Sequence, residues 1–148
     1  MHDPLLTRKL PAELRKHIYR LVLVQLDTID ISLNRTPNEP ALLATCSQIH
    51  DEALSVYYGE NTFLEDIVLS RAQHSWLRSL GIKRAKLITE YRIHLMGSGM
   101  SAMSAQEIQE RLTSAHARDV FDIFEQAGMK LVEVRRDGAV PLEYVVWE

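Results

Sequence analysis

Cys46 and His50 are the residues whose types and spacing come closest to a catalytic pair. They stand four positions apart in a segment with helical periodicity, so an imidazole could reach and deprotonate a thiol. However, Cys46 also falls on the apolar stripe of that segment, where a thiol is usually buried and inert. Neither a glycine-rich elbow nor a third orienting residue accompanies the pair. We therefore expect a structural cysteine, no catalytic residue and no enzyme activity.

The acidic and histidine residues do not form a metal-binding pattern. His50, Asp51 and Glu52 are consecutive, and neighbouring positions of a helix point about 100° apart, so these three cannot converge on one ion. The six histidines are scattered, and none forms a His-x-x-x-His pair. With a single cysteine in the chain, a cysteine-rich metal site is also excluded. We expect no metal and no cofactor.

A basic stretch with aromatic neighbours could contact a phosphate backbone. Its cations are Arg78, Lys83, Arg84, Lys86 and Arg92, and Trp76 and Tyr91 lie beside them. The formal net charge of the chain is -3, which gives no overall attraction to nucleic acid or to an anionic membrane. A solvated basic face is the simpler interpretation, and nucleic-acid binding is kept as a third hypothesis.

Length and composition indicate one intracellular globular domain spanning residues 1–148. The chain is 46% hydrophobic and 25% charged, which is enough apolar material for one core. No apolar run approaches the roughly 20 residues of a membrane span, and the MHDPLLTRKLP start lacks the apolar core of a secretory signal. A lone cysteine suits a reducing compartment. We therefore expect a cytoplasmic or nuclear protein with no membrane partner.

The hydrophobic pattern predicts an α+β fold. Helices are expected over 10–26, from Pro40 to a stop at Gly59, over 70–81 and over 105–127. Strands are expected over 28–33, 62–69, 89–96, 130–136 and 139–147. In total the pattern favours about four helices packed on a largely antiparallel sheet of about five strands, with a candidate flexible joint at 97–104.

The end of the chain favours a β-hairpin. Asp137-Gly138 stands between two strand-like runs, which is a strong signal for a tight turn between antiparallel strands. The last run contains Val145, Val146 and Trp147. If this run forms an edge strand, it could pair with another chain and give a homodimer; an inner strand covered by the long helix is the alternative.

The first two helical segments together resemble the F-box-like domains of filamentous fungi. The segments read LPAELRKHIYRLVL and, further on, PALLATCSQIHDEALSVYYGENTF. The matching positions are Leu10, Pro11, Glu13, Leu14, Arg15, Ile18 and Tyr19 in the first segment and Leu42, Leu43, Cys46, Gln48, Ile49, Glu52, Ala53, Tyr58, Gly59, Asn61, Thr62 and Phe63 in the second. This resemblance divides the domain into an F-box-like region, 10–63, and a C-terminal helix and sheet part, 64–148.

The resemblance implies a non-enzymatic function in protein interaction. An F-box docks on the Skp-type adaptor of a cullin ubiquitin ligase, so Leu10, Pro11, Leu14 and Ile18 are expected to contact such an adaptor, with Leu43 assisting. The chain departs from the family in the longer link over 26–40, which carries a strand.

The alternative is a self-contained protein-binding or homodimerising domain without adaptor docking. Leu14, Ile18 and Leu21 form one stripe, and a stripe of this width usually packs in a core. In that case Leu10, Pro11, Leu14 and Ile18 would all be buried. Whether this stripe faces solvent or core distinguishes the two hypotheses.

Overall fold

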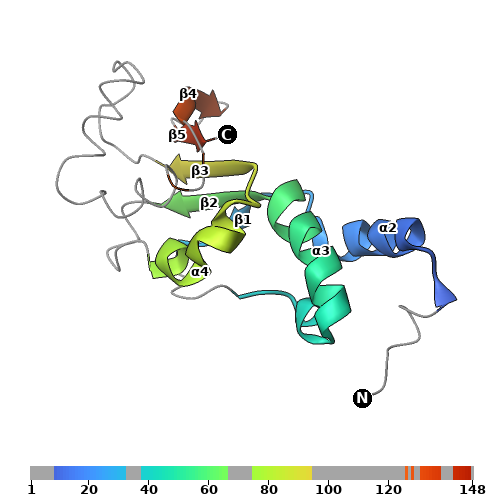
Figure 1. Cartoon of the computed structure of the whole chain (residues 1–148). Coiled ribbons are helices and arrows are strands. Elements are labelled where there is room, and N and C mark those ends of the chain that lie inside the picture. The colour runs from blue at the N-terminus through green and yellow to red at the C-terminus, as the bar shows by residue number, and fades with distance from the viewer. Residues whose placement is uncertain are drawn as a thin grey trace.

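A computed structural model describes residues 9–32, 38–66, 75–94, 126, 128, 131–137 and 142–147 (Figure 1). Its first helix, α2, spans Ala12–Leu23 and packs against α3, Ser47–Glu60. A 3-10 helix, η1, covers Ala41–Ala44 just before α3, and α4 spans Ser75–Ala85. The strands are β1 (Ile29–Asp30), β2 (Thr62–Asp66), β3 (Glu90–His94), β4 (Leu131–Asp137) and β5 (Leu142–Trp147).

The strands form one mixed sheet in the order β1-β2-β3-β5-β4. β1 pairs with β2 in parallel and β2 with β3 in parallel, with Ile29 opposite Phe63 and Phe63 opposite Tyr91. β5 then pairs antiparallel with both β3 and β4. The pairs among β1, β2 and β3 are therefore parallel, and the two pairs that β5 makes are antiparallel.

The prediction of about four helices on a largely antiparallel sheet is wrong. The described residues contain three α-helices, and the first three strands are parallel. The reason is that a helix lies in each connection, α3 between β1 and β2 and α4 between β2 and β3, and such a crossover returns the chain to the same end of the sheet. The predicted helix over 105–127, Gln126 excepted, and the predicted joint over 97–104 lie outside the described residues.

Both crossover helices pack on the same face of the sheet. Phe63 on β2 lies with its ring centroid 5.8 Å from Tyr57 and 5.7 Å from Tyr58, both on α3, and 5.3 Å from Trp76 on α4. Trp76 in turn lies 6.4 Å from Tyr91 on β3. These rings are almost fully buried and form the centre of the core. In Figure 1, α3 stands between this sheet and α2, so α2 lies at the periphery of the molecule.

The predicted second helix is divided at Cys46. η1 ends where the Thr45 hydroxyl donates a hydrogen bond to the Leu42 carbonyl, and Cys46 then adopts an extended backbone with φ −161°. Its Sγ atom accepts a hydrogen bond from the Ile49 N–H, so α3 begins at Ser47 with Cys46 as its N-cap. Gly59 does not end α3, which continues to Glu60. A Cβ atom at Gly59 would lie 3.2 Å from the Leu87 carbonyl oxygen, so the missing side chain permits a close approach.

Candidate functional site

The outer face of α2 is apolar and open to solvent. Leu14 is 52% exposed, Leu21 is 73% exposed and Val22 is 62% exposed. Ile18 is half-buried between them. Leu14, Ile18 and Leu21 are the stripe that hydrophobic periodicity indicated, and we refer to these three residues together with Val22 as the outer stripe. A row of exposed large apolar side chains on one helix is typical of an interaction surface.

The inner face of α2 carries Arg15, Tyr19 and Leu23 instead. These residues lie at intervals of four positions, so they share one side of the helix, and each is buried. Tyr19 and Leu23 are only 1% exposed, and burial of each contributes about 2 kcal/mol to folding. The helix therefore faces its partner α3 with a mixed polar and apolar surface and leaves Leu14 and Leu21 outside.

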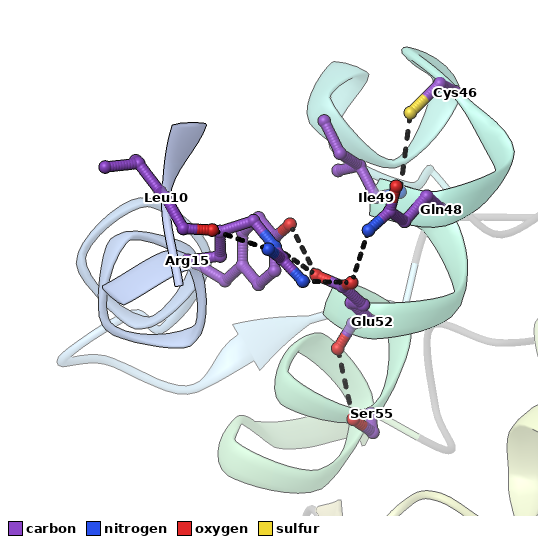
Figure 2. A network of polar contacts seen from close by, with 8 residues as sticks. Leu10, Arg15, Cys46, Gln48, Ile49, Glu52 and Ser55 are labelled. Carbon is purple, nitrogen blue, oxygen red and sulfur yellow. Dashed lines mark hydrogen bonds and ion pairs between the residues drawn. The ribbon is translucent and has the colours of Figure 1, made fainter. Parts of the chain in front are cut away.

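An ion pair between Arg15 and Glu52 fixes this orientation, as Figure 2 shows. Arg15 Nη2 donates to Glu52 Oε1 at 2.6 Å and Arg15 Nε donates to Glu52 Oε2 at 2.8 Å, so the guanidinium and the carboxylate form a bidentate pair. Arg15 Nη1 also donates to the Leu10 carbonyl at 2.7 Å. One side chain thereby ties the start of α2, and the Leu10-Pro11 entrance to it, to the middle of α3.

Glu52 collects further donors around the same carboxylate. The Tyr19 hydroxyl donates to Oε2 at 3.0 Å, and the Gln48 amide nitrogen donates to Oε1 at 2.9 Å. Because the charged form of Glu52 accepts these hydrogen bonds, first from Arg15 and then from Gln48, the pKa of this carboxyl falls to about 2 from its ordinary value of 4.5. Burial raises the pKa of the neighbouring Tyr19 hydroxyl, and its bond to Glu52 adds to that shift.

Asn61 holds the other end of the helix pair. Its side-chain nitrogen donates to the Leu23 carbonyl at 2.9 Å and to the Tyr57 carbonyl at 2.8 Å, and its side-chain oxygen accepts from the Gln25 N–H at 2.8 Å. Arg20 and Glu60 add an ion pair with a shortest distance of 2.8 Å between the same two helices, with both side chains partly exposed. α2 is thus attached to α3 at its beginning, along its length and at its end.

The predicted partner-binding residues separate into three groups in the structure. Pro11 and Leu14 are exposed, and Leu10 and Ile18 are half-buried. Leu43 is only 3% exposed and belongs to the core, so it lies behind the surface rather than on it. The structure therefore brings four of the five residues to one end and one face of α2.

Sequence reasoning missed the polar residues that set this geometry. Arg15, Tyr19, Gln48, Glu52 and Asn61 all belong to the matched F-box-like pattern, although their part in orienting α2 was not foreseen. The spacing of Arg15, Tyr19 and Leu23 could have indicated a second face. Hydrophobic periodicity does not detect this face, because it treats Arg15 as a solvent-exposed polar residue even though Glu52 neutralises its charge.

The side chains of Cys46 and His50 form no hydrogen bond with each other in the described structure, although the His50 N–H donates to the Cys46 carbonyl at 2.9 Å. The Cys46 sulfur caps α3 at 3.5 Å from the Ile49 nitrogen, and His50 Nδ1 donates to the Leu43 carbonyl at 3.1 Å. Both polar groups are therefore engaged with the backbone at the start of α3. Among the described residues, no group of three or more His, Cys, Asp or Glu side chains is placed to hold a metal ion.

The residues of the basic stretch are partly neutralised by carboxylates. Arg84 Nε lies 2.7 Å from Glu39 Oε1, which also accepts a hydrogen bond from the Tyr58 hydroxyl. Arg92 Nε lies 2.6 Å from Glu90 Oε1. Lys83 and Lys86 are exposed, and the side chain of Arg78 lies outside the described residues.

The strand predicted as a possible pairing edge is an inner strand. β5 lies between β3 and β4, with Val145 opposite both Ile93 and Val134. Within the described sheet, β4 is the strand at that edge. A dimer formed by strand pairing at this end would therefore use β4.

The helices of the described residues include none that is long and apolar enough to cross a membrane. No protein-family model, curated protein or solved structure matches this chain.

Proposed function

We propose that this chain is a non-enzymatic protein-interaction domain that docks a Skp-type adaptor of a cullin ubiquitin ligase through the outer face of α2. The exposure of Leu14, at 52%, beside an exposed Pro11 is the observation that carries the proposal. These residues head the F-box-like motif, and a self-contained domain would have buried them. The proposal places the protein in the cytoplasm or nucleus, where such ligases act.

The polar network behind α2 supports the same function. Arg15 and Glu52 satisfy each other on the inner side, so α2 can pack on α3 without using Leu14, Leu21 or Val22. A partner that covers the outer stripe then gains apolar burial without breaking the fold. Because α2 is fixed by several hydrogen bonds, little conformational entropy is lost on docking.

A calorimetric titration of the intact protein with a purified Skp-type adaptor tests the proposal. We expect saturable binding with equal numbers of the two proteins. Leu14→Gln should weaken the binding about tenfold, because a buried anchor at an interface typically contributes at least that factor. Ile82→Gln on α4 is the matched control, since Ile82 is also exposed, at 43%, but belongs to another helix. An adaptor that binds a recognised F-box but not this protein would contradict the proposal.

The alternative function is a self-contained binding or homodimerising domain that uses the β4 edge. Its support is the position of β4 at one side of the described sheet. Sedimentation of the protein alone distinguishes it, because a dimer that persists in the Leu14→Gln variant would favour this alternative.

Nucleic-acid binding has weaker support. Arg84 and Arg92 each have a carboxylate partner, which leaves the exposed Lys83 and Lys86 among the described cations of the basic stretch. Such binding should weaken steeply as salt rises. A fluorescence anisotropy titration with a labelled oligonucleotide at two salt concentrations would detect it.

A further inference from the structure

The helix α2 contributes few side chains to the hydrophobic core. Of the fifteen apolar residues that are buried in the described part of the chain, Tyr19 and Leu23 are the two that belong to α2. The others lie on η1, α3, α4, the strands and the connections between them. In Figure 1, α2 packs on α3 on the side away from the sheet. The aromatic centre of the core around Phe63 is therefore built without α2.

Polar contacts make up much of the attachment of α2 to α3. Arg15 pairs with Glu52, Arg20 pairs with Glu60, and Asn61 holds the last turn of α2. Water replaces such hydrogen bonds when two helices separate, so each contributes only a modest net free energy. The contact between α2 and α3 is therefore weaker than the aromatic packing that joins α3 to the sheet.

Without α3, the segment that forms α2 is a poor helix. It is 12 residues long, and its N-cap residue, Pro11, makes no side-chain hydrogen bond to the first turn. Ile18 and Val22 are β-branched, which lowers helix propensity slightly. Isolated helices of this length are marginal in water. When α2 leaves α3 it should therefore also unfold, so that docking and helix formation are a single step.

The helix α3 has its own attachments and does not depend on α2. Cys46 caps its first turn through the Ile49 N–H. Tyr57 and Tyr58 hold it against Phe63 on β2, with ring centroids 5.8 Å and 5.7 Å apart. Both contacts lie outside α2, so α3 and the sheet can keep their packing after α2 has opened.

We infer that α2 is a conformational switch: it opens and unfolds from α3 as a unit of its own, while α3 and the sheet stay folded. Openings of this kind are drawn from the least stable parts of a fold. The outer stripe is a single surface only while α2 is a helix, so opening removes it. The opening is a property of the fold and needs no adaptor. Its consequence, that α2 must be closed for docking, rests on the proposed function.

Hydrogen exchange of single amides, followed by NMR on the intact wild-type protein in increasing low concentrations of urea, tests the inference. Amides of α2 should exchange at least tenfold faster than those of β2. Urea should accelerate the exchange of α2 less, because its opening exposes less surface than global unfolding does. Equal protection with an equal urea dependence would mean that α2 unfolds only with the whole protein, and would overturn the inference. No adaptor is present, so this result is independent of the proposed function.

Two matched variants, Tyr19→Phe and Tyr91→Phe, give a second readout. Each removes a hydroxyl that donates to a carboxylate, Glu52 for Tyr19 and Glu65 for Tyr91. Loss of a hydrogen bond to a charged group should speed the affected exchange roughly tenfold.

The two variants should differ in which amides respond. Tyr19→Phe should speed exchange in both α2 and β2, because the Tyr19 bond is broken in the open state and in the unfolded state. Tyr91→Phe should speed exchange in β2 alone, because the Tyr91 bond joins two strands and persists when α2 opens. Acceleration of α2 and β2 by the same factor in Tyr91→Phe would show a single cooperative unit and would contradict a separate opening of α2.

Discussion

At the scale of residues, the decisive contact is the one between Arg15 and Glu52. A partly buried ion pair such as this adds little net stability, because desolvation of the two charges offsets much of their attraction. It does specify orientation, since removing either partner leaves the other without its counterion. Here the specified orientation turns Leu14 outward and Tyr19 inward. The charged pair thus determines which face of α2 is available to a partner.

The low pKa of Glu52 predicts how stability depends on pH. Its pKa is about 2 in the folded protein and near 4.5 when the chain is unfolded, so the folded state favours the charged carboxylate. The associated stability is fully present above about pH 5 and is lost as pH falls from 4.5 through 2. Glu60, whose pKa is lowered by Arg20, adds in the same direction.

Urea unfolding of the protein at a series of pH values between 7 and 2.5 measures this effect. Glu52→Gln should be less stable at pH 7 and should show a shallower decline with acid, because the titrating carboxyl has been removed. A wild-type stability that is constant down to pH 3 would show that Glu52 does not stabilise the helix pair.

At the scale of elements, Asn61 connects α2, α3 and the segment that follows α2. Its side chain donates hydrogen bonds to the Leu23 and Tyr57 carbonyls and accepts one from the Gln25 N–H. Loss of these bonds leaves buried polar groups without partners. The two helices and the segment that follows α2 should therefore respond together to a change at this residue.

Asn61→Ala should lower the free energy of unfolding by about 2 to 4 kcal/mol. Chemical denaturation followed by the fluorescence of the buried Trp76 and of Trp147 measures it. Ser55→Ala is the control, because Ser55 is exposed on α3 and makes only a long 3.4 Å hydrogen bond to the Glu52 carbonyl. Equal stabilities of the two variants would exclude a central role for Asn61.

At the scale of the whole molecule, the sequence predicted the kinds of elements better than their arrangement. The helices at α2 and α3 and the strands at β2 and β3 fall within the predicted ranges or close to them, because amphipathic period and turn residues are local signals. The parallel pairing of β1, β2 and β3 was not predicted, because pairing direction depends on where each crossover helix packs. The ring contacts of Phe63 with Tyr57, Tyr58 and Trp76 fix that packing, and the hydrophobic pattern of the sequence does not show them.

The candidate site shows the same division between local and distant information. Leu10, Pro11, Leu14 and Ile18 could be identified from a motif, but their exposure depends on a contact between residues 37 positions apart, Arg15 and Glu52. Hydrophobic periodicity identified the apolar stripe of α2 but left open whether it faces solvent or core, because a local pattern does not show that a paired arginine occupies the inner side. Leu43 was assigned to the surface by the resemblance and lies in the core.

We have proposed that the outer face of α2 is a docking surface, whereas its inner face packs on α3. The most direct test is a calorimetric titration of the Skp-type adaptor with the intact wild type and with the Leu14→Gln/Leu21→Gln double variant, alongside thermal unfolding of both. Both leucines are at least half exposed, so the variant should unfold at nearly the wild-type temperature while its binding is lost. Adaptor binding that survives the double substitution, or a wild type that does not bind, would contradict docking through the outer face of α2.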